Sequence, residues 1–482
     1  MYCGLKHDYG LRHFTKNNKE LYLFIDKNHR DTGLQMEKEL YDFFRFKCDG
    51  HHFIEKTDEN LSKCNASKYL YISENEIEDF EFEPWQISGE GIEYHPELEV
   101  AVTQRCNYNC IYCFETADDS PLYDAFSVEE FDELMQEALD CGVTFIALTG
   151  GEPMVHGHFY SLITSIESRG LMISEIMTNG SLITDEFLDD ISVINACKWT
   201  KFCISFDGVN GKHDKIRNCS SEKVVLENIK KCLTHGFDVK VTYNLNKINI
   251  NELKETTKQL FKMGIKELRI ARTMPSRKMR ILKEDAVLSH KEWLDEALSF
   301  ASWYMSLRDV SMKVDFWNVC VIDPVMKCIT LNSIKSCGSK EIDNEKLMCP
   351  LTYNRVCICG DGMMVPCHQI SGGMRKQDIN LGNVKESGLK SIFEKSPWLD
   401  LVSTKVTERL KHLDTCANCE YWEKCLGGCP YIGAPWRWEY GEKFPYSTDV
   451  TQCEFFKGDY ISKFNSILRD DWWILEPCRI GE

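Results

Sequence analysis

The fold of this chain is decided by the stretch Leu98-Glu-Val-Ala-Val-Thr-Gln-Arg-Cys-Asn-Tyr-Asn-Cys-Ile-Tyr-Cys113. An apolar, strand-like run at its start leads into three cysteines, Cys106, Cys110 and Cys113, with the spacing CxxxCxxC. Three thiolates can hold three corners of a cubane [4Fe–4S] cluster and leave the fourth iron open to an outside ligand. A closed structural site would need four protein ligands, so the spacing favours a reactive cluster.

Two other interpretations of these cysteines have to be weighed. They could bind zinc together with a distant fourth ligand, or they could be unrelated thiols, because an isolated motif is only a hypothesis. The surrounding residues have to decide between these readings.

The composition excludes several classes of protein. With 482 residues, the chain is long enough for two or three domains with full cores. Its net charge of -18 argues against nucleic acid or an anionic membrane surface as partner. We find no secretory pattern at the N-terminus and no apolar run of membrane-spanning length. We therefore expect no membrane partner and a cytoplasmic, reducing location, where grouped cysteines among the 24 are metal ligands more often than disulfides.

Strand-like and helical patterns alternate from residue 98 to about residue 275. This alternation predicts parallel βαβ units with right-handed crossovers, so that six strands curl into a barrel or part-barrel with helices outside. Functional groups of such folds lie at the carboxyl ends of the strands. The expected strands are 100–103, 145–149, 173–178, 202–206, 239–245 and 267–271, and the expected helices are 128–141, 159–168, 185–191, 223–234 and 251–263.

Short polar motifs follow the second, third and fourth of these strands. Residues 149–153 read Thr-Gly-Gly-Glu-Pro, residues 177–180 read Met-Thr-Asn-Gly, and residues 204–208 read Ile-Ser-Phe-Asp-Gly, with His-Asp-Lys-Ile-Arg at 213–217. Glycine lets a backbone approach a ligand closely, a carboxylate accepts bonds from an ammonium group, and a guanidinium pairs with a carboxylate. A plain turn also explains an Asn-Gly pair.

Together these motifs resemble radical S-adenosylmethionine (SAM) enzymes, and residues 204–217 are similar to the SxDG…HDxxR segment of their peptide-acting branch. The resemblance implies a SAM-binding [4Fe–4S] cluster on Cys106, Cys110 and Cys113. It places Ser205 and Arg217 on the SAM carboxylate, whereas we expect His213 and Asp214 to order the loop. The full set of implied SAM contacts is Tyr112, Gly150, Gly151, Glu152, Asn179, Ser205 and Arg217.

A longer cysteine pattern occupies the C-terminal third. Cys349 is followed after twelve residues by Gly362 and after four more by Cys367. The remaining members are Cys416, Cys419, Cys425, Cys429 and Cys453. The order resembles the seven-cysteine SPASM pattern, which zinc ribbons do not produce. SPASM relatives hold two auxiliary [4Fe–4S] clusters, and two fully ligated clusters need eight thiolates.

Cys337 is the best-placed candidate for the eighth ligand. The topology of the relatives implies that Cys337, Cys349, Cys367 and Cys429 hold the nearer cluster, and that Cys416, Cys419, Cys425 and Cys453 hold the farther one. With Cys337 bound, both clusters are closed relays; without it, the nearer cluster has an open iron that could bind a substrate thiolate. For the spare cysteines, a buried packing role is the common outcome, although one could be the eighth ligand or a hydrogen donor. These are Cys320, Cys328, Cys357 and Cys359.

The expected fold class is α/β: a partial (β/α)6 TIM-like radical SAM barrel with a small α+β N-terminal module and an irregular, cysteine-rich SPASM domain. The expected boundaries are 1–95 for the N-terminal module, 96–305 for the core, 306–336 for a bridging region, 337–460 for the SPASM domain and 461–482 for a C-terminal tail. The module resembles in size the peptide-recognition modules fused to peptide-modifying relatives. An extension packed on the barrel explains it equally well.

SPASM enzymes act mostly on peptides and proteins, so the resemblance implies a peptide substrate. We expect a maturase of a ribosomally synthesised precursor peptide, of sactipeptide or ranthipeptide type, that forms a thioether from a Cys thiol. A flavodoxin-like or ferredoxin-like protein would supply single electrons. The alternatives are a carbon–carbon cross-link, epimerisation or formylglycine formation, and a non-catalytic electron-transfer or peptide-binding scaffold.

The residue after Cys367 bears on this choice. Sulfatase maturases carry an aspartate base there, whereas this chain has His368, which argues against formylglycine formation. An imidazole can still serve as a catalytic base, since it titrates near neutrality. A hydrogen bond to a cluster is an equally good explanation of His368.

Overall fold

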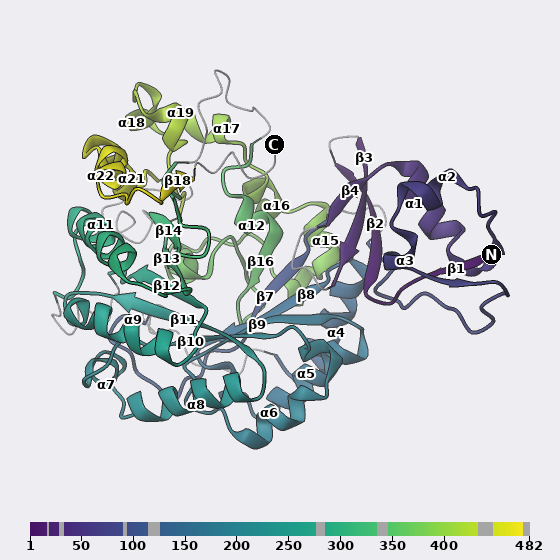
Figure 1. Ribbon diagram of the computed structural model, residues 1–482, viewed down its shortest axis with the longest axis horizontal. Coiled ribbons are helices and arrows are strands. Elements are labelled where there is room, and N and C mark those ends of the chain that lie inside the picture. Colours follow the sequence, from purple (N-terminus) through teal and green to yellow (C-terminus); the bar gives the residue numbers. More distant parts are fainter. Residues whose placement is uncertain are drawn as a thin grey trace.

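A twelve-stranded sheet forms the centre of the molecule, with a smaller N-terminal module projecting at one side (Figure 1). The computed structural model describes residues 1–16, 19–27, 33–89, 94–113, 126–275, 285–334, 346–431 and 447–475. Among these residues, no helix is both long and apolar enough to cross a membrane.

Six parallel strands make up the middle of the sheet. They are β7 (Glu97–Thr103), β8 (Phe145–Gly150), β9 (Met172–Thr178), β10 (Lys201–Ser205), β11 (Asp238–Leu245) and β12 (Glu267–Arg272), and they pair in chain order. The helices between them are α4 (Val128–Asp140), η1 (Pro153–Val155), α5 (Phe159–Ser168), α6 (Asp185–Ser192), η2 (Asn195–Cys197), α7 (Lys212–Arg217), α8 (Glu222–Thr234), η3 (Ile250–Glu252) and α9 (Leu253–Lys262). All six predicted strands and five predicted helices are confirmed. Since the two ends of the sheet do not pair with each other, the fold is a part-barrel.

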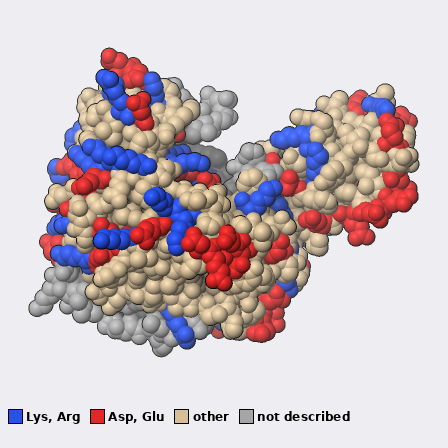
Figure 2. Space-filling model, turned by 60° about the horizontal axis from the view of Figure 1, so that its bottom comes forward, with Lys and Arg blue, Asp and Glu red and all other residues tan. Residues whose placement is uncertain are grey.

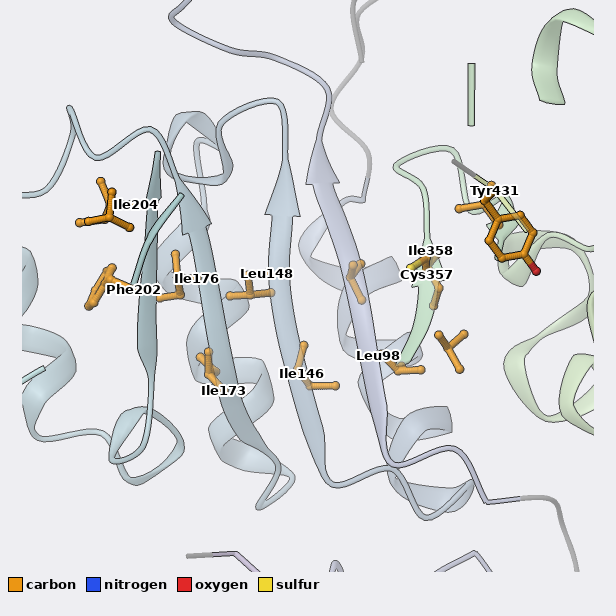
Figure 3. Close-up of a cluster of buried hydrophobic side chains, with 14 of the residues drawn as sticks. Leu98, Ile146, Leu148, Ile173, Ile176, Phe202, Ile204, Cys357, Ile358 and Tyr431 are labelled. Atoms are coloured by element: carbon orange, nitrogen blue, oxygen red, sulfur yellow. The ribbon is translucent and has the colours of Figure 1, made fainter. Parts of the chain in front are cut away.

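Alternating side chains give the sheet an apolar face and a polar face. The apolar face packs under the helices and includes Leu98, Leu148, Ile176 and Phe202, all buried (Figure 3). Side chains of alternate residues point to opposite faces of a strand, so Glu99, Glu175 and Lys201 turn the other way. The pattern that builds the core therefore also lines the opposite side with charges.

The sheet continues beyond the six strands at both edges. After α11 (His290–Ser306), strand β13 (Lys313–Phe316) pairs parallel with β12, and the sheet is extended by β14 (Cys320–Asp323), β15 (Cys328–Thr330) and β18 (Trp473–Leu475). On the other edge, β16 (Arg355–Ile358) pairs parallel with β7, and β17 (Met364–Val365) completes a hairpin with it. Three strands of the sheet, β13, β14 and β15, thus lie within the segment expected to be a bridging region. The turn between β16 and β17 contains Gly362 at φ +83°.

Short helices make up most of the remaining C-terminal part. They are α12 (Pro350–Asn354), η4 (His368–Ile370), α13 (Ser371–Lys376), α14 (Val384–Ser387), α15 (Leu389–Glu394), α16 (Pro397–Val402), α17 (Val406–Leu410), α18 (Asp414–Ala417), α19 (Trp422–Cys425), α21 (Val450–Lys457) and α22 (Tyr460–Ser466). None exceeds eight residues, which matches the expected irregular character.

The N-terminal module is an α+β unit with its own core. Its elements are β1 (Tyr2–Leu5), β2 (Tyr9–Lys16), β3 (Lys19–Asp26), β4 (Leu34–Met36), α1 (Lys38–Phe46), β5 (Asp49–Phe53), α2 (Glu59–Lys63), α3 (Ala66–Tyr69) and β6 (Leu70–Ser73). Two three-stranded sheets enclose aromatic residues such as Phe24 and Phe44. Residues 34–36 form β4, which pairs antiparallel with β3.

Two buried cations fasten this module to the core. Arg12, 1% exposed, donates from Nε to the carbonyl of Gly142 at 2.9 Å and from Nη2 to Thr144 Oγ1 at 3.3 Å. Lys27 lies over the Trp85 ring and donates to the carbonyl of Gly170 at 2.7 Å. These bonds reach across more than a hundred residues of chain, so they hold the module in one orientation.

We predict that Arg12→Ala loosens this joint. The substitution removes charge-assisted bonds from buried carbonyls, so the free energy of opening the joint should fall by about 3 kcal/mol. Hydrogen–deuterium exchange should then quicken at the joint, and trypsin should cut between module and core. Lys6→Ala, which removes only exposed bonds inside the module, is the control. Equal protection in both variants would contradict the role given to Arg12.

Candidate functional site

The motifs found in the sequence meet at one edge of the sheet. Cys106 follows β7, Gly150 ends β8, Asn179 follows β9 and Ser205 ends β10. Because these strands are parallel neighbours, their carboxyl ends lie side by side, as expected for the catalytic edge of such a fold.

The three cysteines of the CxxxCxxC motif gather next to this edge. Burial, with smaller contributions from the nearby Cys110 and Cys113, raises the pKa of Cys106 to about 12. Such thiols stay protonated on their own and ionise when a metal binds. The three cysteines can therefore each bind one iron of a [4Fe–4S] cluster.

Glycine is required at the end of β8 because of the neighbouring strand. A Cβ on Gly150, whose φ is +143°, would lie 2.2 Å from the carbonyl oxygen of Thr103, and one on Gly151 would lie 2.4 Å from that of Arg105. The expectation that these glycines make room for a ligand is therefore incomplete. They first let the backbone after β7, which carries the cysteines, press against β8.

Glu152 is more deeply bound than expected. It is fully buried and accepts from the backbone N–H of Asn179 at 2.6 Å and from Thr178 Oγ1 at 2.7 Å. Burial raises the pKa of its carboxyl to about 7, despite these bonds. The carboxylate thus ties the ends of β8 and β9 together, and a ligand ammonium group there would meet a buried carboxyl group.

Asn179 connects β9 to the cysteine loop. Its Nδ2 donates to Asn107 Oδ1 at 2.7 Å, and Asn107 in turn donates to Ser181 at 2.9 Å. The side chain predicted to line the cofactor site therefore also fixes the loop between Cys106 and Cys110.

Arg217 has one donor to spare. Its Nε donates to Asp207 at 2.7 Å, and its Nη1 lies 3.8 Å from Cys110 Sγ. Nη2 is buried without an acceptor among the described residues. Tyr112 donates to the same Asp207 carboxylate at 2.6 Å. Such an orphaned donor beside a cluster thiol fits the predicted contact with a ligand carboxylate.

The loop after β10 is ordered as expected. His213 is buried, stacks on Phe206 and accepts from the N–H of Asp207 at 3.2 Å. Burial lowers its pKa to about 4, so it is neutral. Asp214 accepts two backbone bonds at the start of α8. Ser205, half-buried at the end of β10, is left at the open edge.

The C-terminal cysteines fall into two groups. Cys416, Cys419, Cys425 and Cys453 line one cavity, which is the set assigned to the farther cluster. Cys349, Cys367 and Cys429 lie close enough to interact with one another and with the buried hydroxyl of Tyr431, and they form the second group. Cys337, the candidate eighth ligand, lies outside the described residues.

Buried donors stand at both groups. Trp422, which lines the first cavity, has no acceptor for its Nε1–H among the described residues, and the buried hydroxyl of Tyr431 lies beside the thiols of the second group. Native proteins rarely leave a buried donor unpaired, and sulfur atoms of a cluster accept hydrogen bonds. The first cavity and the thiols of the second group therefore suit iron–sulfur clusters.

His368 contacts the polar face of the sheet. Its Nε2 lies 3.5 Å from a Glu99 carboxylate oxygen, and its Nδ1 lies 3.8 Å from Cys359 Sγ. Ligand atoms of Glu99, Cys357 and His368 all lie within 4.8 Å of one another. The sequence analysis missed Glu99, because only the pairing of β16 with β7 brings it to His368. The spare thiols Cys320, Cys328, Cys357 and Cys359 are all buried.

Comparison with known families agrees with this geometry. The family model of the Radical SAM superfamily matches residues 100–260, and that of the SPASM iron-sulfur cluster-binding domain matches residues 349–420. The chain therefore carries a radical SAM domain and a SPASM domain. It is therefore an enzyme that binds SAM and [4Fe–4S] clusters, and the scaffold alternative is set aside.

Relatives and solved structures cover most of this radical SAM chain. It is 26% identical over 336 residues to AdoMet-dependent heme synthase of Nitratidesulfovibrio vulgaris, covering 68% of this chain and 85% of the relative. It is 24% identical over 327 residues to GTP 3′,8-cyclase of Clostridium perfringens, covering 64% of this chain and 90% of the relative.

Two solved structures share the fold. Streptococcus suis SuiB with S-adenosylmethionine has a TM-score of 0.64 at 16% identity and covers 93% of this chain and 99% of its own. The structure of anSMEcpe with AdoMet has a TM-score of 0.56 at 17% identity and covers 77% of this chain and 98% of its own. The SuiB match therefore extends well beyond the radical SAM and SPASM segments.

We predict that Arg217→Lys weakens SAM binding by about tenfold or more. Lysine keeps a positive charge for Asp207 but loses the forked donor that a carboxylate pairs with. Equilibrium binding of SAM to the iron-loaded protein measures this. Arg169→Lys, in a partly exposed pair with Asp132, is the matched control and should bind SAM like the parent. Unchanged affinity in Arg217→Lys would remove Arg217 from the SAM site.

Proposed function

We propose that this radical SAM enzyme is a maturase that modifies a ribosomally synthesised precursor peptide, with a Cys thioether cross-link as its product. The observation that carries the proposal is the parallel pairing of β16 with β7. This pairing brings the segment of Cys367 and His368 against the strand that leads into the CxxxCxxC motif. A substrate at the sheet edge would thus lie between the SAM site and an auxiliary cluster site.

The polar face of the sheet suits a peptide. Arg355 pairs with Glu97 at 2.7 Å and with Glu175 at 2.9 Å, while Lys201 pairs with Glu267 at 2.7 Å. Lys240, which lies on β11 between β10 and β12, forms no ion pair within the described residues. A face of this composition favours polar backbone and side chains over an apolar small molecule. SuiB, which shares the fold, was solved with its precursor peptide SuiA.

The bound SAM and its cluster would supply a 5′-deoxyadenosyl radical that takes a hydrogen atom from a substrate carbon. The new C–S bond then forms between this carbon and the sulfur of a substrate Cys. The thiol proton goes to a base, for which we propose His368, held by Glu99. One electron leaves as the bond closes, and an auxiliary cluster is the proposed acceptor. A one-electron donor of flavodoxin or ferredoxin type restarts the cycle.

The N-terminal module is proposed to hold the peptide's leader. One side of it carries exposed acidic residues, which gather along the projecting part of the molecule (Figure 2). They are Glu74, Glu76, Glu78, Asp79 and Glu81. A negatively charged docking surface attracts a positively charged partner, so a leader with lysine or arginine residues would suit this side.

A second outcome at the same site is epimerisation. The buried thiol of Cys357, close to His368 and Glu99, is the observation that favours it, because epimerisation needs a hydrogen donor inside the site. Carbon–carbon cross-linking and formylglycine formation remain further alternatives on the same scaffold.

The proposal predicts a specific change in mass. A short Cys-rich open reading frame next to the gene should be co-expressed anaerobically with this chain, and the peptide should lose two hydrogens per thioether. Cys110→Ala is the control, and it should form neither product nor 5′-deoxyadenosine. An unchanged mass with inverted stereochemistry would indicate epimerisation instead. Turnover of SAM without any peptide change would argue against a precursor peptide as substrate.

We predict that His368→Asn uncouples radical formation from product. Asparagine keeps a polar side chain of similar shape but cannot take a proton, so 5′-deoxyadenosine should form normally while cross-linked peptide falls by about a hundredfold. His235→Asn, on the outer helical layer, is the control. Loss of iron or an altered cluster spectrum in His368→Asn would indicate that His368 supports the cluster and is not a base.

A further inference from the structure

Arg409 is a buried cation whose hydrogen bonds go to backbone carbonyls. It lies on α17, is fully buried, and forms no ion pair in the part of the chain that the structure describes. Nη1 donates to the carbonyl of Gly428 at 2.8 Å, and Nη2 donates to those of Gly427 at 3.0 Å and Ser447 at 2.7 Å. Nε has no acceptor among the described residues. Burying a charge is unfavourable unless opposite charge lies near it, so negative charge beside this guanidinium is stabilising.

The loop from Cys425 to Cys429 is wrapped around this side chain. Leu426, Gly427 and Gly428 have φ values of 51°, 78° and 66°, and this run of left-handed residues turns their carbonyls toward the guanidinium. A leucine rarely adopts this conformation. A Cβ on Gly427 would lie only 3.1 Å from Nη1 of Arg409. The strain indicates that the loop is shaped to hold Arg409.

The two ends of this loop belong to different cysteine groups. Cys425 lines the cavity of the farther group, whereas Cys429 lies with Cys349 and Cys367. The ionisable groups that act on Arg409 are Cys429, Asp449, Cys416 and Cys425. The Asp449 carboxylate also accepts from the backbone N–H of Cys429 at 3.0 Å. When the cysteines of both groups bind clusters, their thiolates add negative charge beside Arg409 to that of Asp449.

We propose that Arg409 is the shared counter-cation of the two auxiliary clusters and sets their reduction potentials together. The proposal rests on the ligand set proposed above. A cluster gains one negative charge on reduction, and a fixed positive charge in a low-dielectric interior stabilises that state. No cysteine of the CxxxCxxC motif faces Arg409, so the SAM-binding cluster serves as an internal reference.

Redox titration of the full-length, iron-loaded protein, followed by EPR, tests this. Arg409→Gln should shift the ratio of reduced to oxidised auxiliary clusters at least tenfold toward oxidised at a fixed potential, which corresponds to about 59 mV for one electron. Arg409→Lys keeps the charge and should retain parent-like potentials. The SAM-binding cluster should not move in either variant.

Arg12→Gln is the matched control, because Arg12 is equally buried and held by carbonyls but faces no cysteine. Its cluster potentials should equal those of the parent. Fully loaded Arg409→Gln with unchanged potentials would overturn the proposal. Equal loss of auxiliary iron from the Gln and Lys variants would also overturn it, because it would give Arg409 a purely structural role. A parent chain that binds only the SAM cluster would instead refute the ligand set, whatever the peptide product.

Discussion

The pairing of β16 with β7 is the contact on which the arrangement of this molecule depends. Two stretches more than 250 residues apart in the sequence become adjacent parallel strands. Arg355 secures the junction, since its guanidinium reaches Glu97 and Glu99 on β7 and Glu175 on β9. These acids would repel one another without it. This cation therefore reinforces the junction between the SPASM domain and the radical SAM domain and keeps three carboxylates on the polar face.

The SAM edge is organised by packing before any ligand arrives. Gly150 and Gly151 let the backbone after β7 press against β8, while the carboxylate of Glu152 bonds to the end of β9. Asn179 then reaches the cysteine loop through Asn107. Glu152 and Asn179 thus have structural partners, and Arg217 keeps one buried donor for a ligand. Such preorganisation reduces the reorganisation that binding would otherwise require.

Local patterns in the sequence were sufficient to predict the central sheet and the edge where its motifs meet. Runs such as 239–245 alternate regularly, and the cysteine spacings are specific, so both could be read without knowledge of contacts. The contacts of Glu99, Arg355 and Arg409 could not be predicted, because their partners lie far away in the chain or are backbone carbonyls. Strands β13 to β15 were missed because they have only three or four residues. The reason for Gly150 also needed the structure, since it lies in the neighbouring strand.

The joint made by Arg12 and Lys27 keeps the N-terminal module at a fixed distance from the radical SAM edge of the sheet. A peptide anchored on the N-terminal module would have to span a constant gap before any of its residues entered the radical edge. The count of residues between anchor and target would then be set by the enzyme, not by the peptide. In precursor peptides with spacers of different length, the modified residue would lie the same number of residues from the anchor, whatever side chains occur elsewhere in the peptide.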